Sequence, residues 1–450
     1  MTREVETGRV GRSSRTWQVA AVAVAVVLVA AAYGLRGTIG ARGQAACGVV
    51  FFIALVASFS PDLRRVNWRT VVTGFAIQVV LALFILKFEV GGVRPGYHLF
   101  TMIGNGVKRF LEFTNAGSLF VFGGLADQTA MSKIFAGGFV FAFTALPTII
   151  FVSSFFTVLY YFGILQFIVR VMAKAMMFLM QTSGAETLSA AANVFMGQTE
   201  APIIVKPYVP KMTQSELLAL MVGGLATISG GVMAVYIQLG ADPVAILTTS
   251  VMAAPGGLYL SKILLPETDE PLTRGEVKMV VERTHVNAID AASSGASDGM
   301  TLAFNVAAML IAFLAFIALF DYLLALIHPE LSLSRLFSWV FSPMAVLMGV
   351  RSADVPAIAD LLGTKLVANE FVAFVKLTTE YRQSLDPRSY SLATFALTGF
   401  ANFSSIGILL GGIGGMAPGR RHDLAKLGFR ALLAGFTATM INSSLASILL

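Results

Sequence analysis

Two short polar segments, each carrying a glutamate, interrupt an otherwise strongly apolar sequence. Residues 197–202 read Gly-Gln-Thr-Glu-Ala-Pro, and residues 368–373 read Ala-Asn-Glu-Phe-Val-Ala. Each is followed by a hydrophobic stretch that small polar residues break in turn, at 227–231 and at 402–405. A carboxylate in the hydrocarbon of a bilayer costs at least roughly 2.5–3.5 kcal/mol. Chain that leaves the helix at this depth must be buried in protein or line a cavity.

The composition assigns the chain to a membrane. Of its 450 residues, 56% are hydrophobic and only 13% are charged, whereas soluble proteins carry about 25% charged residues. A helix needs about 20 apolar residues to cross a bilayer. Nine stretches meet this need: 17–35, 44–60, 70–88, 138–163, 215–239, 242–264, 300–327, 390–414 and 428–449. The predicted fold class is an all-α membrane protein with about nine transmembrane helices in the lipid bilayer.

The positions of Lys and Arg predict a cytoplasmic N-terminus and a C-terminus outside. Basic residues gather in the loops assigned to the cytoplasm, while the outside loop 240–243 has none, as the positive-inside rule requires. The net charge of +7 is therefore attributed to topology, and no nucleic-acid partner is expected. The segment 89–137 fits this topology less well, and 96–113 is expected to be an amphipathic helix in the interface.

Two stretches are predicted to be re-entrant helical hairpins. Residues 183–210 and 354–378 both read as a short helix, a polar tip and a second short helix. By the loop assignment, the first hairpin enters from the cytoplasm and the second from outside. Similar units that enter from opposite sides form an inverted-topology repeat, which is typical of the substrate site of a secondary transporter.

This interpretation divides the chain into six parts. They are a tail with an extra transmembrane helix (1–43), scaffold and interfacial helices (44–182), the first hairpin and first transport half (183–264), a cytoplasmic loop (265–299), a scaffold helix with a surface helix at 331–348 (300–348), and the second hairpin with an unwound helix and a final helix (349–450).

Glu200 and Glu370 lie at the predicted hairpin tips, beside side chains that both donate and accept hydrogen bonds. Each glutamate could instead cap a broken helix end or form an ion pair. Ligand binding is the favoured role, because a carboxylate binds hydroxyl pairs and amide N–H groups strongly. No arginine joins the cluster, which disfavours a strongly anionic ligand. The residues alone predict a small solute rich in hydroxyl and amide groups and do not choose among sugars, polyols and related compounds.

The second break, 402–405, adds Asn402 and Ser405, which are expected to contact the ligand, while Phe400 could stack on a flat ring or serve packing alone. Near the first tip and break, Asn193, Thr199, Thr227 and Ile228 suggest a site for a hard monovalent cation. Unwound backbone supplies carbonyl oxygens there, and Asn and Thr side chains add neutral oxygen ligands.

Two rival classes are disfavoured. An intramembrane enzyme would need paired aspartates, a Ser–His pair or a metal cluster, and the four histidines lack ligand spacing. The single cysteine, Cys47, allows no disulfide within the chain. An ion channel is disfavoured because an asymmetric pair of hairpins does not build a symmetric filter. The chain is expected not to be an enzyme and to need no organic cofactor.

The motifs resemble those of the concentrative nucleoside transporter family. The resemblance covers roughly residues 44–450 and rests on six stretches: 189–210, 211–231 with Gly-Gly-Leu-Ala-Thr-Ile-Ser-Gly-Gly, 252–260, 305–313, 367–374 with Asn-Glu-Phe-Val-Ala, and 399–412 with Phe-Ala-Asn-Phe-Ser-Ser-Ile. It implies a homotrimer that imports nucleosides across the bacterial inner membrane by alternating access, each protomer having a scaffold and a mobile transport domain.

The resemblance also implies roles for individual residues. Gln198, Thr199 and Glu200 would face the nucleobase with Val232 beside them, Glu370, Asn402 and Ser405 would hold the ribose, and Phe400 would lie near the base. Sodium would bind Asn193, Thr227 and the backbone oxygens of Met196 and Ile228. Proton coupling is the alternative. Proton-coupled members tend to carry Ser-Glu-Asn after Gly-Gln, and Thr-Glu-Ala-Pro in this chain favours sodium.

Overall fold

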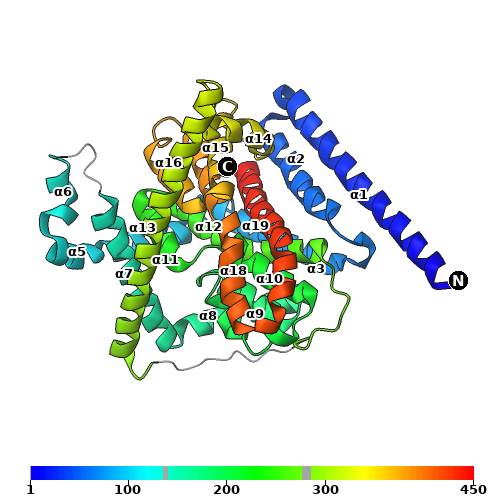
Figure 1. Cartoon of the computed structure of the whole chain (residues 1–450), viewed down its shortest axis with the longest axis horizontal. Coiled ribbons are helices and arrows are strands. Elements are labelled where there is room, and N and C mark those ends of the chain that lie inside the picture. Colours follow the sequence, from blue (N-terminus) through cyan, green and yellow to red (C-terminus); the bar gives the residue numbers. More distant parts are fainter. Residues whose placement is uncertain (1, 135–139, 276–284) are drawn as a thin grey trace.

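The structure is a computed structural model that describes residues 2–134, 140–275 and 285–450. Within these ranges it contains helices and no strand (Figure 1). The first part of the chain forms α1 (Thr2–Gly34), α2 (Arg36–Ser58), η1 (Leu63–Arg65), α3 (Trp68–Leu86), α4 (Pro95–Glu112), α5 (Thr114–Phe122), η2 (Gly123–Ala126), α6 (Gln128–Met131), α7 (Phe141–Tyr161) and α8 (Ile164–Met180).

The remaining elements fall into two similar series around a long helix. The first series is α9 (Gly184–Ala192), η3 (Ala201–Val205), η4 (Val209–Lys211), α10 (Gln214–Ala226), α11 (Gly230–Leu239) and α12 (Pro243–Leu264). Next come α13 (Ala288–Ile327) and α14 (Leu333–Leu347). The second series is α15 (Val355–Val367), α16 (Glu370–Thr379), α17 (Pro387–Leu397), α18 (Phe403–Met416), η5 (Pro418–Arg420) and α19 (Arg421–Leu449).

Eight helices or helix pairs in the described ranges are long and apolar enough to cross a membrane: 16–34, 37–58, α3, α7, 214–239, α12, α13 and 418–449. The ninth expected span, 390–414, is instead divided into α17 and α18. The interfacial helix expected at 96–113 corresponds to α4, and the surface helix expected at 331–348 corresponds to α14.

Two boundaries differ from the sequence-based expectation. The loop expected at 265–299 ends earlier, because α13 begins at Ala288, where the Asn287 side chain accepts a hydrogen bond from the Asp290 N–H and caps the helix. Residues 276–284 of that loop lie outside the described residues. In the first hairpin, the second arm is formed by the 3-10 turns η3 and η4. Pro202 and Pro210 lie in these turns and have no N–H for a helix hydrogen bond.

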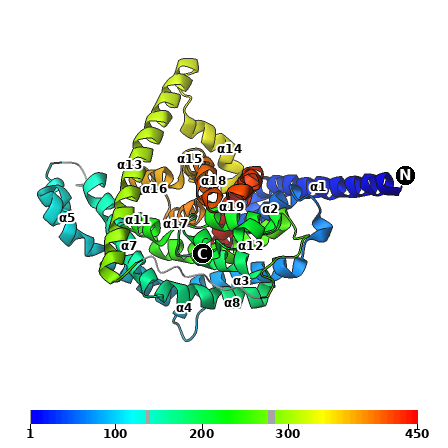
Figure 2. The same cartoon turned by 60° about the horizontal axis from the view of Figure 1, so that its bottom comes forward.

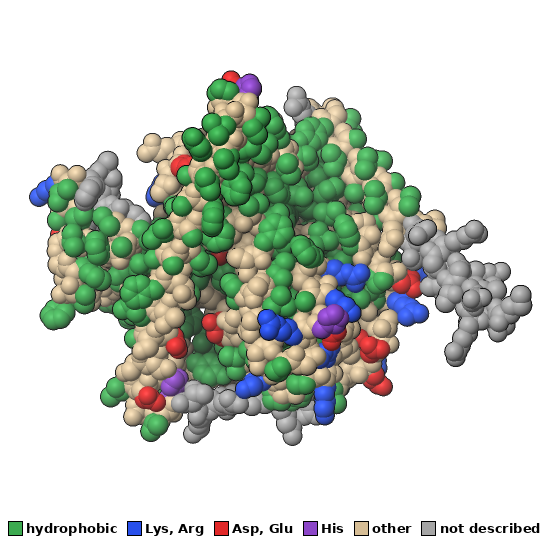
Figure 3. Space-filling view, viewed as in Figure 1, with side chains coloured by type: hydrophobic (Ala, Val, Ile, Leu, Met, Phe, Trp, Pro, Cys, Tyr) green, Lys and Arg blue, Asp and Glu red, His purple; other side chains and the backbone are tan. Residues whose placement is uncertain are grey.

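The buried centre of the molecule consists of α10, α11, α12 and α19, whereas residues 16–34 of α1 and most of α13 are exposed. Figures 1 and 2 both show α1 projecting from one flank and α5 from the opposite flank. In Figure 3, hydrophobic side chains cover most of the upper part of the face, and charged side chains gather mainly toward its lower part. An apolar exposed surface on helices of this length suits contact with lipid chains.

Candidate functional site

Two broken helices meet at the centre of the fold. The pair α10 and α11 is interrupted at 227–229, and the pair α17 and α18 at 398–402. The Phe400 N–H donates to the Thr227 carbonyl over 3.1 Å and joins the two breaks. Gly399 has a φ of +152°, and a Cβ there would lie 3.1 Å from the Leu225 and Ala226 carbonyl oxygens. Only glycine suits both this backbone conformation and this close approach.

The tip of the first hairpin packs against both broken helices. The Gly230 N–H donates to the Phe195 carbonyl over 2.9 Å, which ties the tip to the start of α11. A Cβ on Gly224 would lie 2.8 Å from the Cβ of Gln198, and one on Gly412 would lie 2.9 Å from Thr199 Cγ2. Glycines in α10 and α18 therefore make room for the tip residues.

Glu370 is the first residue of α16 and is almost fully buried. Its Oε2 accepts a hydrogen bond from Asn402 Nδ2 over 2.7 Å, and its Oε1 accepts one from the Tyr236 hydroxyl over 3.3 Å. Asn369 caps the same helix by accepting from the Val372 N–H over 2.9 Å. The helix N-terminus favours negative charge, so the carboxylate has a helix dipole and two donors to stabilise it.

Asn402 is held in one orientation by the helix that it caps. Its Oδ1 accepts hydrogen bonds from the Ser405 N–H over 2.8 Å and the Ser404 hydroxyl over 2.7 Å, so its amide nitrogen points to Glu370. Ser405 Oγ in turn accepts from Gln198 Nε2 over 3.4 Å. The structure therefore links four predicted ligand contacts, one from the first hairpin, one from the second and two from the second break.

Two buried polar atoms of this cluster have no hydrogen-bond partner among the described residues. They are Gln198 Oε1 and Asn369 Nδ2, and both residues are more than 90% buried. An unpaired buried polar group costs about 1–3 kcal/mol. One free acceptor and one free donor beside a carboxylate suit a ligand that carries hydroxyl and amide groups.

A second polar position lies beside the first break. Asn193 is fully buried, and its Nδ2 donates to the Ser189 carbonyl over 3.0 Å, which leaves Oδ1 without a partner among the described residues. The Thr227 hydroxyl donates to the Gly223 carbonyl over 2.8 Å, and its oxygen can still accept or bind a cation. Ile228 is also fully buried, and Met196 is half-buried. Neutral oxygens of this kind fit a hard monovalent cation.

Glu200 occupies a different surface from Glu370. It is exposed and lines a cavity of about 310 Å³ between the first hairpin tip, α7 and α13, a volume within the usual range for a small-molecule site. Other lining residues include Ser153, Phe156, Thr157, Tyr160, Phe195, Met196, Gly197, Ser229, Gly231 and Asp298, together with apolar side chains of α7, α8, η3 and α13. Neither Glu370 nor Asn402 lines this cavity. Val232, expected beside the base, is almost fully buried in the first turn of α11.

The sequence did not single out Tyr236 or Asp298. Tyr236 stacks on Phe374 with ring centroids 4.0 Å apart, and its hydroxyl reaches Glu370. A tyrosine in an apolar helix gives no signal that separates this role from packing. Asp298 belongs to the first part of α13, which was expected to be loop because residues 288–299 lack a continuous apolar run, so its charge gave no signal of a site.

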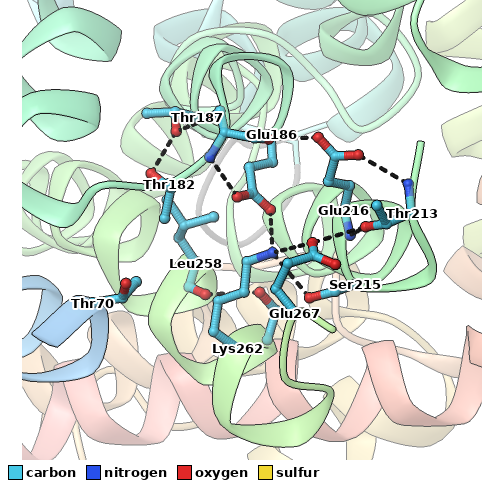
Figure 4. Close-up of polar contacts among 12 residues, drawn as sticks. Thr70, Thr182, Glu186, Thr187, Thr213, Ser215, Glu216, Leu258, Lys262 and Glu267 are labelled. Atoms are coloured by element: carbon cyan, nitrogen blue, oxygen red, sulfur yellow. Dashed lines mark hydrogen bonds and ion pairs between the residues drawn. The ribbon is translucent and has the colours of Figure 1, made fainter. Parts of the chain in front are cut away.

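A buried ionic cluster lies at the root of the first hairpin (Figure 4). Lys262 Nζ of α12 lies 2.6 Å from Glu186 Oε2 of α9 and 3.4 Å from Glu267 Oε2, and it donates to Ser215 Oγ over 2.9 Å. The Ser183 hydroxyl donates to Glu216 over 2.6 Å. This cluster joins α9, α10 and α12 into one unit. It thereby fixes the root of the first hairpin, at the end opposite its tip.

These features define a membrane carrier for a small hydroxylated solute, and comparison with known proteins identifies the family. Residues 47–125 and 245–447 match the N-terminal and C-terminal parts of the Na+ dependent nucleoside transporters, and residues 142–243 match a "nucleoside recognition" gate domain. The chain belongs to the concentrative nucleoside transporter family. It is a multi-pass membrane transporter and not an enzyme.

Relatives cover most of this chain. It is 42% identical over 412 residues to an uncharacterised transporter of Haemophilus influenzae, covering 89% of this chain and 96% of the relative. It is 40% identical over 423 residues to mouse sodium/nucleoside cotransporter 1, covering 89% of this chain but only 63% of that longer protein.

The fold is also that of solved family members. An inward-facing, substrate-bound structure of CNTnw superposes with a TM-score of 0.84 at 37% identity, covering 90% of this chain and 97% of that one. A CNTnw double variant in an outward-facing state superposes with a TM-score of 0.86 at 37% identity, covering 91% and 97%.

Proposed function

We propose that this protein is a symporter that imports nucleosides across the bacterial inner membrane, driven by a sodium gradient. The observation that carries the proposal is the cluster of Glu370, Asn402, Ser405 and Gln198, with one free acceptor and one free donor at its edge. A ribose presents neighbouring hydroxyls, and a carboxylate beside an amide can accept from and donate to such a pair.

The substrate contacts follow from this arrangement. Glu370, Asn402 and Ser405 hold the ribose hydroxyls, and Phe400 lies near the base. Gln198, Thr199 and Glu200 face the nucleobase, with Val232 lining that side. Of these base-side residues, Glu200 lines the cavity that extends from the first hairpin tip toward α7 and α13, which supports a ligand contact for Glu200.

Sodium is the coupling ion and binds at the first break. Its ligands are Asn193 Oδ1, the Thr227 hydroxyl and the backbone oxygens of Met196 and Ile228. The free Oδ1 of fully buried Asn193 supports this assignment. The hydrogen bond from Gly230 to Phe195 joins tip and break at the same place, so sodium binding there orders the hairpin tip before the nucleoside docks.

The driving force is sufficient with one sodium per nucleoside. A positive charge that crosses 100 mV supplies about 2.3 kcal/mol, and a tenfold sodium gradient adds roughly 1.4 kcal/mol. Together they support an accumulation of roughly a few hundred-fold.

The protein assembles as a homotrimer through its exposed apolar helices. The long helix α13 has exposed large apolar residues along most of its length, including Phe304, Ile311 and Phe316. Cross-linking of the protein in membranes, with a trimer as the largest product, is the expected result.

Uptake of labelled uridine into proteoliposomes tests the proposal, with an inward sodium gradient compared with choline at constant pH. Sodium-dependent accumulation is expected. Accumulation that follows a proton gradient and ignores sodium would assign the coupling to protons. Absence of uptake for both uridine and adenosine under both gradients would refute nucleoside import.

A further inference from the structure

The two halves of the transport core end their first helix segment in the same way. Thr227 terminates α10, and its hydroxyl donates to the carbonyl four residues earlier, Gly223, over 2.8 Å. Thr398 terminates α17, and its hydroxyl likewise donates to the carbonyl of Thr394 over 2.7 Å. Each helix end faces the first arm of its own hairpin, α9 in one half and α15 in the other. The two breaks are therefore equivalent positions of the repeat.

In the second half, a lysine side chain from α15 contacts the C-terminal end of α17. Lys365 lies in the last turn of α15 and is fully buried. Its Nζ donates to the Ala396 carbonyl over 2.7 Å and to Thr439 Oγ1 over 2.9 Å, and it lies 5.4 Å from the centre of the Phe436 ring. Terminal carbonyls form the negative pole of a helix, so the ammonium neutralises the end of α17.

In the first half, the equivalent helix end has no such side chain. Among the described residues, no Lys or Arg donates a hydrogen bond to the last carbonyls of α10. The neighbouring hairpin arm supplies the neutral Asn193, whose Oδ1 is free. The negative C-terminal end of α17 thus has a cationic side chain, Lys365, beside it. The equivalent end of α10 has neutral oxygen ligands such as Asn193 Oδ1 instead.

We infer that the Lys365 ammonium is the fixed cation of the second half, in the place that corresponds to the exchangeable sodium of the first. This rests on the proposed sodium site. The second half then binds no sodium, and its positive charge stays with the protein throughout the transport cycle.

Two neutral variants separate charge from packing. Lys365→Met fills the space without a charge, whereas Lys365→Thr leaves room and a hydroxyl for an ion. Nucleoside binding to the purified full-length protein is measured over a range of sodium concentrations. At low sodium both variants are expected to bind at least roughly tenfold more weakly than wild type. High sodium should then restore Lys365→Thr but not Lys365→Met, with a steeper sodium dependence than wild type.

Lys376→Met is the matched control, because Lys376 belongs to the same hairpin but pairs with Asp360 away from the break. It should lower thermal stability without changing the sodium dependence. The inference is overturned if both Lys365 variants bind as wild type does, or if both lose affinity equally at all sodium concentrations.

If the neutral variants do not fold, the wild-type protein still provides a test. Parallel uptake of ²²Na⁺ and labelled nucleoside should give one sodium per nucleoside, and two would overturn the inference. Wild-type uptake that ignores sodium would instead refute the proposed function, so the two failures are distinguishable.

Discussion

Glu370 shows how a single buried charge can be stable and still available to a ligand. It lies at the N-terminus of α16 and accepts hydrogen bonds from Asn402 and Tyr236. A carboxylate has about four acceptor positions, so two protein donors leave room for hydroxyl donors from a ligand. Charge-assisted hydrogen bonds are about twice as strong as neutral ones.

Glu370→Gln should therefore remove the charge-assisted hydrogen bonds to the ribose and weaken nucleoside binding, while the protein remains folded. Loss of hydrogen bonds to a charged group costs about 1.5–3 kcal/mol, which corresponds to a nucleoside Kd raised roughly 10- to 100-fold or more. Binding is measured by calorimetry on purified protein, with Glu89→Gln as control because Glu89 forms only an exposed pair with Arg94. Normal uptake by Glu370→Gln would refute the role.

Tyr236→Phe is the companion change, because it removes only the hydroxyl and keeps the ring stacked on Phe374. A roughly 2- to 10-fold weaker nucleoside Kd is expected from the loss of one hydrogen bond of about 0.5–1.5 kcal/mol.

At the residue scale, the sequence predicted four members of this cluster. A polar side chain at a break in an apolar membrane segment is costly and therefore indicates a functional site. Gln198, Glu370, Asn402 and Ser405 meet in the structure. Tyr236 could not be found in this way, since its ring serves the apolar core and only its hydroxyl touches the site. Pattern alone also did not reveal that Glu200 and Glu370 face different surroundings, which depends on how the tips turn.

At the element scale, the two helix breaks and the order of helices follow from hydrophobic length and polar interruption. The start of α13 could not be predicted from the sequence, because residues 288–299 are rich in Ala, Ser and Gly and lack a continuous apolar run. Their small size has a packing reason. A Cβ on Gly295 would lie 2.8 Å from Ser154 Cα, and one on Gly299 would lie 2.7 Å from Ile150 Cα. This Gly-x-x-x-Gly pattern lets α13 and α7 approach closely.

Gly299→Leu should consequently separate α13 from α7 and reduce both thermal stability and transport. Four added carbon atoms at a backbone contact cannot be accommodated without displacement of one helix, and overpacking typically costs about 1–3 kcal/mol. Thermal unfolding in detergent measures the effect. Ser297→Leu, at an exposed position of the same helix, serves as control, and equal Tm values for the two variants would contradict the packing role.

The ionic cluster at the root of the first hairpin belongs to the same scale, because it joins three helices. Lys262→Met should destabilise the protein by about 3–5 kcal/mol, since it leaves buried Glu186 without its cation. Arg94→Gln breaks an exposed pair and should change stability by less than about 1 kcal/mol. Adding Glu186→Gln to Lys262→Met should restore part of the loss. Thermal unfolding of all four proteins tests this, and an unchanged Tm for Lys262→Met would count against it.

At the scale of the whole molecule, the two hairpins lie toward opposite ends of the fold. Figure 1 shows α9 near the lower end and α15 with α16 near the upper end, while α13 extends along one side of the molecule from the lower to the upper end. With 40 residues at about 1.5 Å each, α13 is roughly 60 Å long and exceeds the roughly 30 Å of a hydrocarbon core. A single crossing by α13 thus separates the roots of the two hairpins.

This arrangement predicts that the loops next to the two roots lie on opposite sides of the membrane. The loop before α13 contains the exposed Thr268, and the loop after α16 contains the exposed Ser384. Because Cys47 is the only cysteine, a Cys47→Ala background allows each position to be labelled alone as Thr268→Cys or Ser384→Cys. A membrane-impermeant maleimide should label the 384 variant in right-side-out vesicles and the 268 variant only in inverted ones. If both were labelled from the same side, α13 would not separate the hairpin roots, and the inverted repeat on which alternating access depends would have to be abandoned.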